Sequence, residues 1–226
     1  MTGFDIGILA GSGPEAGIDL WQAVLAGRRA RLGAAYRGDI DAPSVMVRSD
    51  PRLGASMDLA SCREEMADLV VEHARILDVA CGAWAIACNT LNGVVDDVHA
   101  VGVGRQLVTF PGALQRWLDA EDRGRVVLLG AAPVSDLGEH SAYHSIGGRL
   151  VAMSDGQRHE MHELIQSIKV AGPFAAERDR FAAFCDTVDA DHIVLACTEL
   201  SLVADPRDER FVDVTRLVAH DLLEAR

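Results

Sequence analysis

The hydrophobic positions of this chain form short continuous runs that alternate with longer stretches of helical spacing. Runs of Val, Ile, Leu and Ala without alternating polar residues are typical of strands covered on both faces, as in parallel sheets. They predict strands at Asp5–Ala10, Ser44–Arg48, Ala83–Cys88, Val108–Phe110, Arg125–Gly130, Arg149–Ala152, His192–Cys197 and Phe211–Val214. Helical spacing predicts helices at Pro14–Leu32, Met57–Val79, Gly112–Glu121, Asp136–Ser145, Gln157–Lys169, Pro173–Val188 and Thr215–Glu224. This alternation indicates an α/β fold with right-handed crossovers.

The two halves of the chain also repeat two short patterns in the same order. Ile8–Gly11 recurs as Val127–Gly130, and Ala85–Thr90 recurs as Val194–Glu199. One match between short apolar runs arises easily by chance, but two matches in the same order are less easily accidental. We therefore predict two similar α/β lobes, with an active site in the cleft between them. The predicted lobes are residues 1–100 and 101–205, and a C-terminal helix in 206–226 is expected to pack back on the first lobe.

Charge and composition exclude several classes of protein. The chain has 226 residues and a formal net charge of −13, so a polyanion such as a nucleic acid would be repelled. Hydrophobic residues make up 49% and charged residues 24%, which is ordinary for a globular protein. The first residues lack a signal-peptide pattern, and no apolar run is long enough to cross a membrane. We therefore expect a cytoplasmic protein with no membrane or nucleic-acid partner.

The five cysteines, at positions 62, 81, 88, 185 and 197, form no CxxC pair. The sequence therefore predicts neither a disulfide framework nor a metal site, and free thiols suit a reduced compartment. Cys88 and Cys197 each end a buried-looking strand, and small polar residues follow both. Ligands of open α/β sheets bind at the carboxyl ends of strands, and a helix that starts there would favour a thiolate. Either cysteine alone could be a core residue, but their equivalent positions in two similar halves favour a function.

Two thiols that face each other across a cleft suit the inversion of a carbon stereocentre. That reaction needs a base on one face of the carbon and an acid on the other, and a thiol can take either role. The remaining three cysteines are interpreted as core or surface residues. The small residues Gly11 and Ser12, between a strand and a helix, would let the backbone approach a small ligand, since no complete nucleotide-binding motif surrounds them.

These motifs resemble those of the aspartate/glutamate racemase superfamily of cofactor-independent enzymes, and most closely its aspartate racemase branch. Ala10–Pro14 resembles the Gly-Gly-Met-Gly-Pro turn of that branch, Cys88–Thr90 its Cys-Asn-Thr motif, and Cys197–Leu200 its Cys-Thr-Glu-Leu motif. The resemblance extends over essentially the whole chain. It implies two α/β lobes related by pseudo-twofold symmetry, a homodimer, no cofactor, and a small amino acid or carboxylate as the substrate.

The resemblance also implies roles for single residues. Cys88 and Cys197 would be the catalytic acid and base. Asn89, Thr90 and Thr198 would hold the carboxylate and amino groups of the substrate. Gly11, Ser12 and Glu199 complete the candidate substrate site next to these motifs. The Asp-Ser-Gly start and the Cys-Thr-His motif of glutamate racemases of the cell-wall type are absent, so that branch fits less well.

Several positions depart from the pattern of the branch. Leu91 and Asn92 stand where Ala-His is frequent, Ser12 replaces the usual Met, and Gly17 replaces a common Thr. We expect these residues to line or adjoin the pocket and to bear on substrate preference. The superfamily also contains hydantoin racemases, maleate isomerases and arylmalonate decarboxylases, and the decarboxylases tend to keep one cysteine. Two cysteines therefore favour racemisation or epimerisation.

Arg48 and Lys169 are the candidate partners of a side-chain carboxylate. The guanidinium of Arg48 could hold a carboxylate in a bidentate fork. Lys169, the single lysine of the chain, resembles by its position the basic partner of the side-chain carboxylate in aspartate racemases. If both face the cleft, the substrate is an acidic amino acid, aspartate or glutamate. If neither does, a neutral amino acid fits better. A related isomerase or lyase and a carboxylate-binding protein without activity remain open as alternatives.

Overall fold

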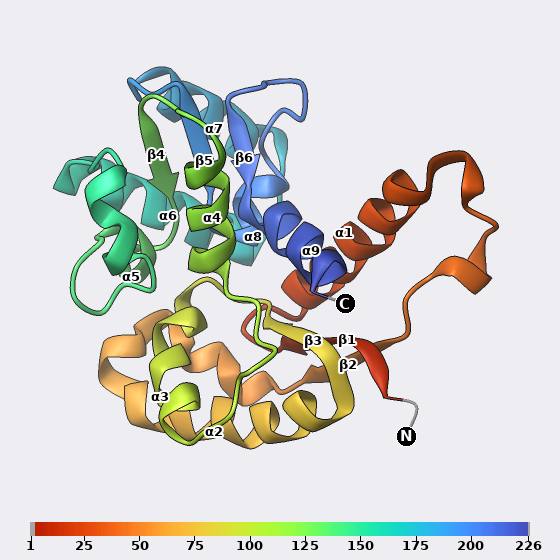
Figure 1. Ribbon diagram of the computed structural model, residues 1–226. Helices are drawn as coiled ribbons and strands as arrows, with labels where there is room; N and C mark the ends of the chain where they lie inside the picture. The colour runs from red at the N-terminus through yellow and green to blue at the C-terminus, as the bar shows by residue number, and fades with distance from the viewer. Residues whose placement is uncertain (1–2, 226) are drawn as a thin grey trace. The chain divides into compact units, whose positions relative to one another are not determined.

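The computed structural model describes residues 3–225, and these fall into two compact units (Figure 1). The first unit runs up to Leu114 and also contains the C-terminal segment from Thr215 onward; the second is Gln115–Val214. Each unit holds one three-stranded sheet of described residues in which all neighbouring strands are parallel. The predicted α/β class with parallel sheets is confirmed.

The sheet of the first unit has β1 at its centre. Its order is β2-β1-β3, formed by β1 (Phe4–Ala10), β2 (Val45–Ser49) and β3 (Cys81–Ile86). Ile6 and Ile8 are fully buried, because helices cover the sheet on both faces. This arrangement explains the continuous apolar run that predicted β1.

Helices lie on both faces of that sheet. Figure 1 shows α2 (Leu59–Ala80) and α3 (Val95–Ala100) on one face, where a core of buried residues such as Leu9, Leu77 and Trp84 packs. α1 (Pro14–Leu32) lies against the other face, and α9 (Val214–Glu224) lies beside α1. Arg31 ties these two helices together, since its Nη1 donates to the Leu223 carbonyl at 2.8 Å and pairs with Glu224 at 2.8 Å.

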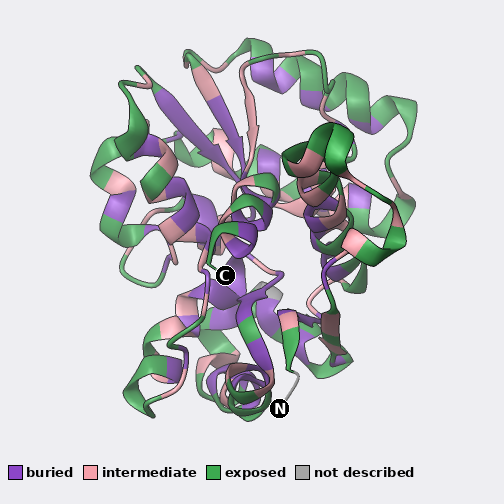
Figure 2. Cartoon of the chain, turned by 45° about the vertical axis from the view of Figure 1, so that its right-hand side comes forward, coloured by how far each residue is buried: buried purple, intermediate pink, exposed green. Residues whose placement is uncertain are grey.

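The sheet of the second unit has the order β4-β5-β6, and Figure 2 shows its first two strands as largely buried. Its strands are β4 (Val126–Leu129), β5 (His192–Leu195) and β6 (Phe211–Asp213). The helices of this unit are α5 (Ala132–Ser135), α6 (Asp155–Ala171), α7 (Ala175–Asp186) and α8 (Thr198–Ser201), and α4 (Phe110–Ala120) joins the two units along the chain. Ser154 and Gln157 form a reciprocal capping box that starts α6.

Two predicted strands are not strands in the structure. In the segment Val108–Phe110, Val108 only donates to the Trp84 carbonyl at 2.8 Å, and Phe110 already begins α4. Pro111 explains the helix start, because a proline is tolerated in the first turn of a helix and has no N–H to add to a ladder. In Arg149–Ala152, Val151 makes a single parallel bridge to Val127.

The predicted helix Asp136–Ser145 is also wrong. The chain forms only the single turn α5 before this segment and then leaves the helical conformation at Leu137, whose φ is 54°. A left-handed residue followed by Gly138 cannot continue a right-handed helix. Ser141 instead anchors the loop, because its hydroxyl donates to the Val134 carbonyl at 2.7 Å.

No helix within residues 3–225 has the length and apolar character that a membrane span requires. The same residues contain no cluster of three or more His, Cys, Asp or Glu side chains with the geometry of a metal site.

Candidate active site

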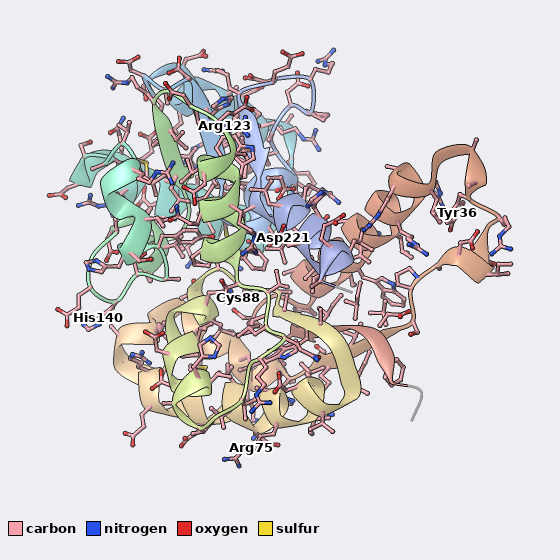
Figure 3. All side chains as sticks on the ribbon, viewed as in Figure 1. Tyr36, Arg75, Cys88, Arg123, His140 and Asp221 are labelled. Carbon is pink, nitrogen blue, oxygen red and sulfur yellow. The ribbon has the colours of Figure 1, made fainter. Side chains whose placement is uncertain are left out.

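Cys88 lies just beyond the end of β3, at the edge of the first sheet where the carboxyl ends of the strands meet (Figure 3). The preceding residues Ala83–Ile86 are fully buried, so the strand is fixed up to this point. After Cys88 the chain turns into a 3-10 helix at Thr90–Val94. The thiol is therefore half-buried on a rigid strand end, which is a suitable place for a reacting group.

One acceptor and one donor contact the Cys88 thiol. Its thiol donates to Ser12 Oγ at 3.2 Å, and the Leu91 backbone N–H points at the sulfur from 3.5 Å. Ser12 Oγ lies 2.5 Å from Ser56 Oγ, so a second hydroxyl stands behind the first. If Cys88 loses its proton, the Ser12 hydroxyl can rotate and donate to the thiolate.

The turn after β1 places Ser12 in contact with Cys88. Gly11 has a φ of +130°, and a Cβ on this residue would lie 2.0 Å from the carbonyl oxygen of Asp50. Only glycine fits, because the backbone conformation is left-handed and the neighbouring strand end leaves no space. The small residue that the sequence indicated at this position is thus required by the packing of β1 against the segment after β2.

Asn89 and Thr90 follow Cys88 in the same turn and are both buried, with 6% and 7% of their surface exposed. They lie next to Cys88 along the chain, as the motif predicted. Their roles toward a substrate remain a prediction.

Leu91 and Asn92, the departures from the racemase motif, serve packing. Leu91 is 1% exposed and belongs to the core under the sheet. The Asn92 amide nitrogen donates to the carbonyls of Cys88 and Ile86 at 2.8 and 3.3 Å, and its oxygen accepts from Phe110 N–H at 3.0 Å. The expectation that these two residues set substrate preference from the pocket therefore finds no support in their contacts.

Gly17, another departure from the racemase pattern, also serves packing. A Cβ on Gly17 would lie 2.5 Å from the Cβ of Ala10, so α1 rests directly on β1 at this point. The close approach excludes the larger Thr of the racemase pattern unless the helix moves.

Arg48 is held by a histidine that the sequence did not single out. Its Nε donates to His73 Nδ1 at 3.0 Å, and His73 Nε2 lies 3.0 Å from Asp50 Oδ2. Nδ1 can accept only in a neutral imidazole, so Nε2 carries the proton and donates it to Asp50. Within residues 3–225, Arg48 forms no ion pair with a carboxylate.

Asp50 is already neutralised by another arginine. Arg52 grips its carboxylate with Nε at 3.0 Å and Nη2 at 2.5 Å, and this contact together with His73 holds the Asp50 pKa well below its usual range. The cluster of Arg48, His73, Asp50 and Arg52 therefore carries two positive charges, on the arginines, and one negative charge, on Asp50. The charge of Arg48 is therefore not neutralised by this cluster, and its guanidinium can bind an anion. Arg48 and His73 are 25 residues apart in the chain, and no sequence motif indicates their contact.

Cys197 occupies the corresponding place in the second unit, just after β5 and Ala196. Its thiol donates to Glu199 Oε2 at 2.9 Å, and the Thr198 hydroxyl donates to the same oxygen at 3.2 Å. Lys169, at the end of α6, forms an ion pair with Glu199 Oε1. The structure thus brings three residues of the predicted site, Cys197, Thr198 and Lys169, around the carboxylate of a fourth, Glu199.

The protonation states of this cluster follow from its charges. Burial and the adjacent Glu199 carboxylate raise the pKa of the Cys197 thiol well above its usual value of 9.0. Burial opposes ionisation of Glu199, but the hydrogen bond from Cys197 and the ion pair with Lys169 outweigh it and lower the pKa of Glu199. The expectation that the local field favours a thiolate is wrong for Cys197, because α8 is one turn long and a carboxylate faces the sulfur.

Replacement of Glu199 by glutamine tests this assignment. Removing the like charge should lower the pKa of Cys197, so alkylation of Cys197 by iodoacetamide is expected to begin about one pH unit lower than in the wild-type protein. Mass spectrometry of the peptide with Cys197, after labelling over a pH series, measures the shift. Glu163→Gln, an exposed carboxylate on α6 that faces His159, is the control and should leave the profile unchanged.

The other three cysteines differ from this pair. Cys81 and Cys185 are buried, and burial raises the pKa of Cys185 to about 12 and that of Cys81 to a lesser degree. Cys62 donates to the Asp58 carbonyl at 3.2 Å, and burial and nearby carboxylates raise its pKa. The interpretation of these three as core or surface residues agrees with their burial and contacts.

The fold assembled above, with a cysteine after the inner or edge strand of each parallel sheet, is the fold of the aspartate and glutamate racemases. The Picrophilus torridus aspartate racemase superposes with a TM-score of 0.78 at 16% identity, over 97% of this chain and 93% of that one. An aspartate racemase homologue from Pyrococcus horikoshii gives 0.74 at 19% identity, over 97% of both chains. A glutamate racemase from Campylobacter jejuni gives 0.61 at 12% identity, over 98% and 86%.

These likenesses confirm the resemblance at the level of the fold. No protein-family model matches the chain, and no curated protein matches it in sequence.

Proposed function

We propose that this protein is a cofactor-independent amino-acid racemase, an isomerase that acts on aspartate or glutamate by two-base proton transfer. The observation that carries the proposal is the pair of half-buried cysteines, each just after the carboxyl end of a parallel strand. The Cys88 thiol donates a hydrogen bond to the Ser12 hydroxyl, and the Cys197 thiol donates one to the Glu199 carboxylate. The shared fold with aspartate and glutamate racemases supports it.

The two sulfurs would begin the reaction in different states. Cys197 is held as a thiol, so it would deliver a proton to the α-carbon. Cys88, next to a hydroxyl and a backbone N–H, would remove the proton from the opposite face as a thiolate. After one turnover the states are exchanged, and Glu199 then faces a Cys197 thiolate. The repulsion between them favours return of the proton to Cys197.

An acidic substrate follows from the charge of Arg48. Its guanidinium contacts a neutral imidazole through Nε, which leaves the two Nη groups able to form a fork toward a carboxylate. Lys169 already pairs with Glu199, so its contribution to substrate binding would be shared with that carboxylate. In this proposal Asn89, Thr90 and Thr198 hold the α-carboxylate and amino groups, and Gly11 and Ser12 border the ligand.

Replacement of Arg48 by alanine should therefore lower kcat/KM for the acidic substrate by about 10- to 100-fold, the value of hydrogen bonds to a charged group. Kinetics on aspartate and glutamate measure the change. Arg63→Ala is the control, since Arg63 pairs with Asp97 on the surface of the same unit. Equal activity of R48A and wild-type protein would exclude Arg48 as the carboxylate partner.

The function itself is tested by exchange of the α-proton in D₂O. Purified protein is incubated with each enantiomer of aspartate, glutamate and alanine, and NMR follows loss of the α-proton while chiral chromatography follows inversion. Exchange with inversion of aspartate or glutamate is the expected result. Turnover of maleate, a hydantoin or an arylmalonate instead would identify a related isomerase or lyase. Thermal stabilisation by aspartate without exchange would identify a binding protein.

We further propose how the racemase is organised and where it acts. The two lobes of the racemase would be residues 1–100, with the C-terminal helix of 206–226, and residues 101–205. The protein would act as a cytoplasmic homodimer that needs no cofactor or metal. All five cysteines are free, which suits a compartment that keeps thiols reduced.

A further inference from the structure

Ser56 has a fully buried hydroxyl in contact with the candidate active site. It lies in the 3-10 segment Pro51–Asp58 that follows β2, and none of its surface is exposed. A buried hydroxyl needs a hydrogen-bond partner, and the partner here is Ser12 Oγ at 2.5 Å. Ser56 lies outside the three motifs that mark the candidate site in the sequence.

The segment that carries Ser56 is fixed against the Gly11 turn. The Asp50 carboxylate accepts from Arg52 N–H at 2.9 Å, and the Asp50 backbone N–H donates to the Ala10 carbonyl at 3.1 Å. Leu53, in the same segment, is fully buried in the core. The Ser56 hydroxyl is therefore held in place by the fold rather than by an adjustable loop.

We infer that Ser56 is a positioning residue that acts on Cys88 through Ser12. This inference rests on the proposed function of Cys88 as an acid and base. The three groups form a chain in which Cys88 Sγ is 3.2 Å from Ser12 Oγ, and Ser12 Oγ is 2.5 Å from Ser56 Oγ. No proton needs to travel along this chain; only the directions of the hydrogen bonds change.

The chain supports both states of Cys88. When Cys88 is a thiol, its S–H donates to Ser12, and the Ser12 hydroxyl donates to Ser56 or to water, since Ser12 is only partly buried. When Cys88 is a thiolate, Ser56 donates to Ser12 and Ser12 donates to the sulfur. A hydroxyl that accepts a hydrogen bond is a better donor, so Ser56 strengthens the contact that stabilises the thiolate. Ser56 thus matters most in the charged state.

A double-mutant cycle of Ser12→Ala and Ser56→Ala tests the inference. We expect Ser56→Ala to slow alkylation of Cys88 by iodoacetamide about threefold, because the loss of thiolate is partly offset by a more nucleophilic sulfur. Ser12→Ala should slow it further. In the Ser12→Ala background, the additional Ser56→Ala change should have almost no effect, since its only route to Cys88 is then missing. For the racemisation rate, kcat should follow the same pattern, with KM little changed.

The double-mutant cycle distinguishes an effect of Ser56 on Cys88 through Ser12 from a general effect of Ser56 on the fold. Ser61→Ala removes an exposed hydroxyl that binds the Asp58 carbonyl at 3.0 Å, and it serves as the matched control with unchanged Cys88 reactivity. If Ser56→Ala slows alkylation equally in both backgrounds, Ser56 acts through the fold and the inference is wrong. It is equally wrong if Ser56→Ala has no effect. Alkylation reports on Cys88 without a substrate, so a protein that shows the cycle but racemises nothing would overturn only the proposed function.

Discussion

Replacing Cys88 or Cys197 by alanine is expected to lower the racemisation rate by about a thousandfold or more, because each variant lacks the acid or the base on one face of the α-carbon. Both variants should still fold, since both side chains are half-buried at strand ends rather than in the centre of a core. Circular dichroism of an aspartate or glutamate solution measures the rate.

Residual proton exchange in these variants gives a sharper result. A protein with one base left can remove the α-proton of only one enantiomer. Exchange in D₂O, where any remains, should therefore be confined to one hand in Cys88→Ala and to the opposite hand in Cys197→Ala. Cys62→Ala is the control and should racemise at the wild-type rate. It removes a thiol of the first unit that donates a hydrogen bond to a backbone carbonyl. Wild-type rates in both strand-end variants would refute the two-base proposal.

Replacing Gly11 by alanine is expected to destabilise the first unit by about 3 kcal/mol or more and to abolish activity with it. One part of the loss comes from the φ of +130°, which an L side chain rarely adopts. The larger part comes from the new Cβ, which would lie 2.0 Å from the Asp50 carbonyl oxygen and would force the ends of β1 and β2 apart.

Gly38→Ala separates these two contributions. Gly38 also has a positive φ, +96°, but no atom lies within 4 Å of a Cβ built on it. Urea unfolding of both variants, followed by circular dichroism, should give a much lower midpoint for Gly11→Ala. Equal midpoints would mean that the Asp50 contact contributes little and that the turn can relax.

The sequence predicted most of the strands because their residues are buried on both sides. Ala83–Ile86 and Ile193–Leu195 lie between layers of helices, so no polar residue interrupts them. The same apolar signal gave wrong predictions at Val108–Phe110 and Arg149–Ala152. Leu107, just before the first segment, and Val151 in the second each form a single parallel bridge to a strand, and the chain then leaves the sheet. Apolar character reports burial, but it does not report how many neighbouring residues share a ladder.

The sequence predicted where the two cysteines lie relative to their strands. It did not predict which side chains pair with the charged residues of the candidate site. Cys88 and Cys197 follow their strands as the sequence indicated, since a strand end is a local property. The partners of charged groups are set by residues far apart in the chain, as in Arg48 with His73 and Lys169 with Glu199. A single sequence holds no signal for such pairs. The sequence therefore predicted a lowered pKa for Cys197, whereas burial and Glu199 raise it.

The three hydrogen bonds of Asn92 limit how this protein could come to bind a different ligand. Its amide nitrogen donates to the carbonyls of Ile86, the last residue of β3, and of Cys88, and its oxygen accepts from the first residue of α4. Both N–H groups of the side chain are therefore used, and neither can be offered to a ligand. A substitution at this position would release three backbone groups before it reached a substrate. Changes in specificity, by natural drift or in a mutant library, are therefore expected to accumulate at positions such as 12 and 48, while position 92 stays fixed by the architecture around the first cysteine.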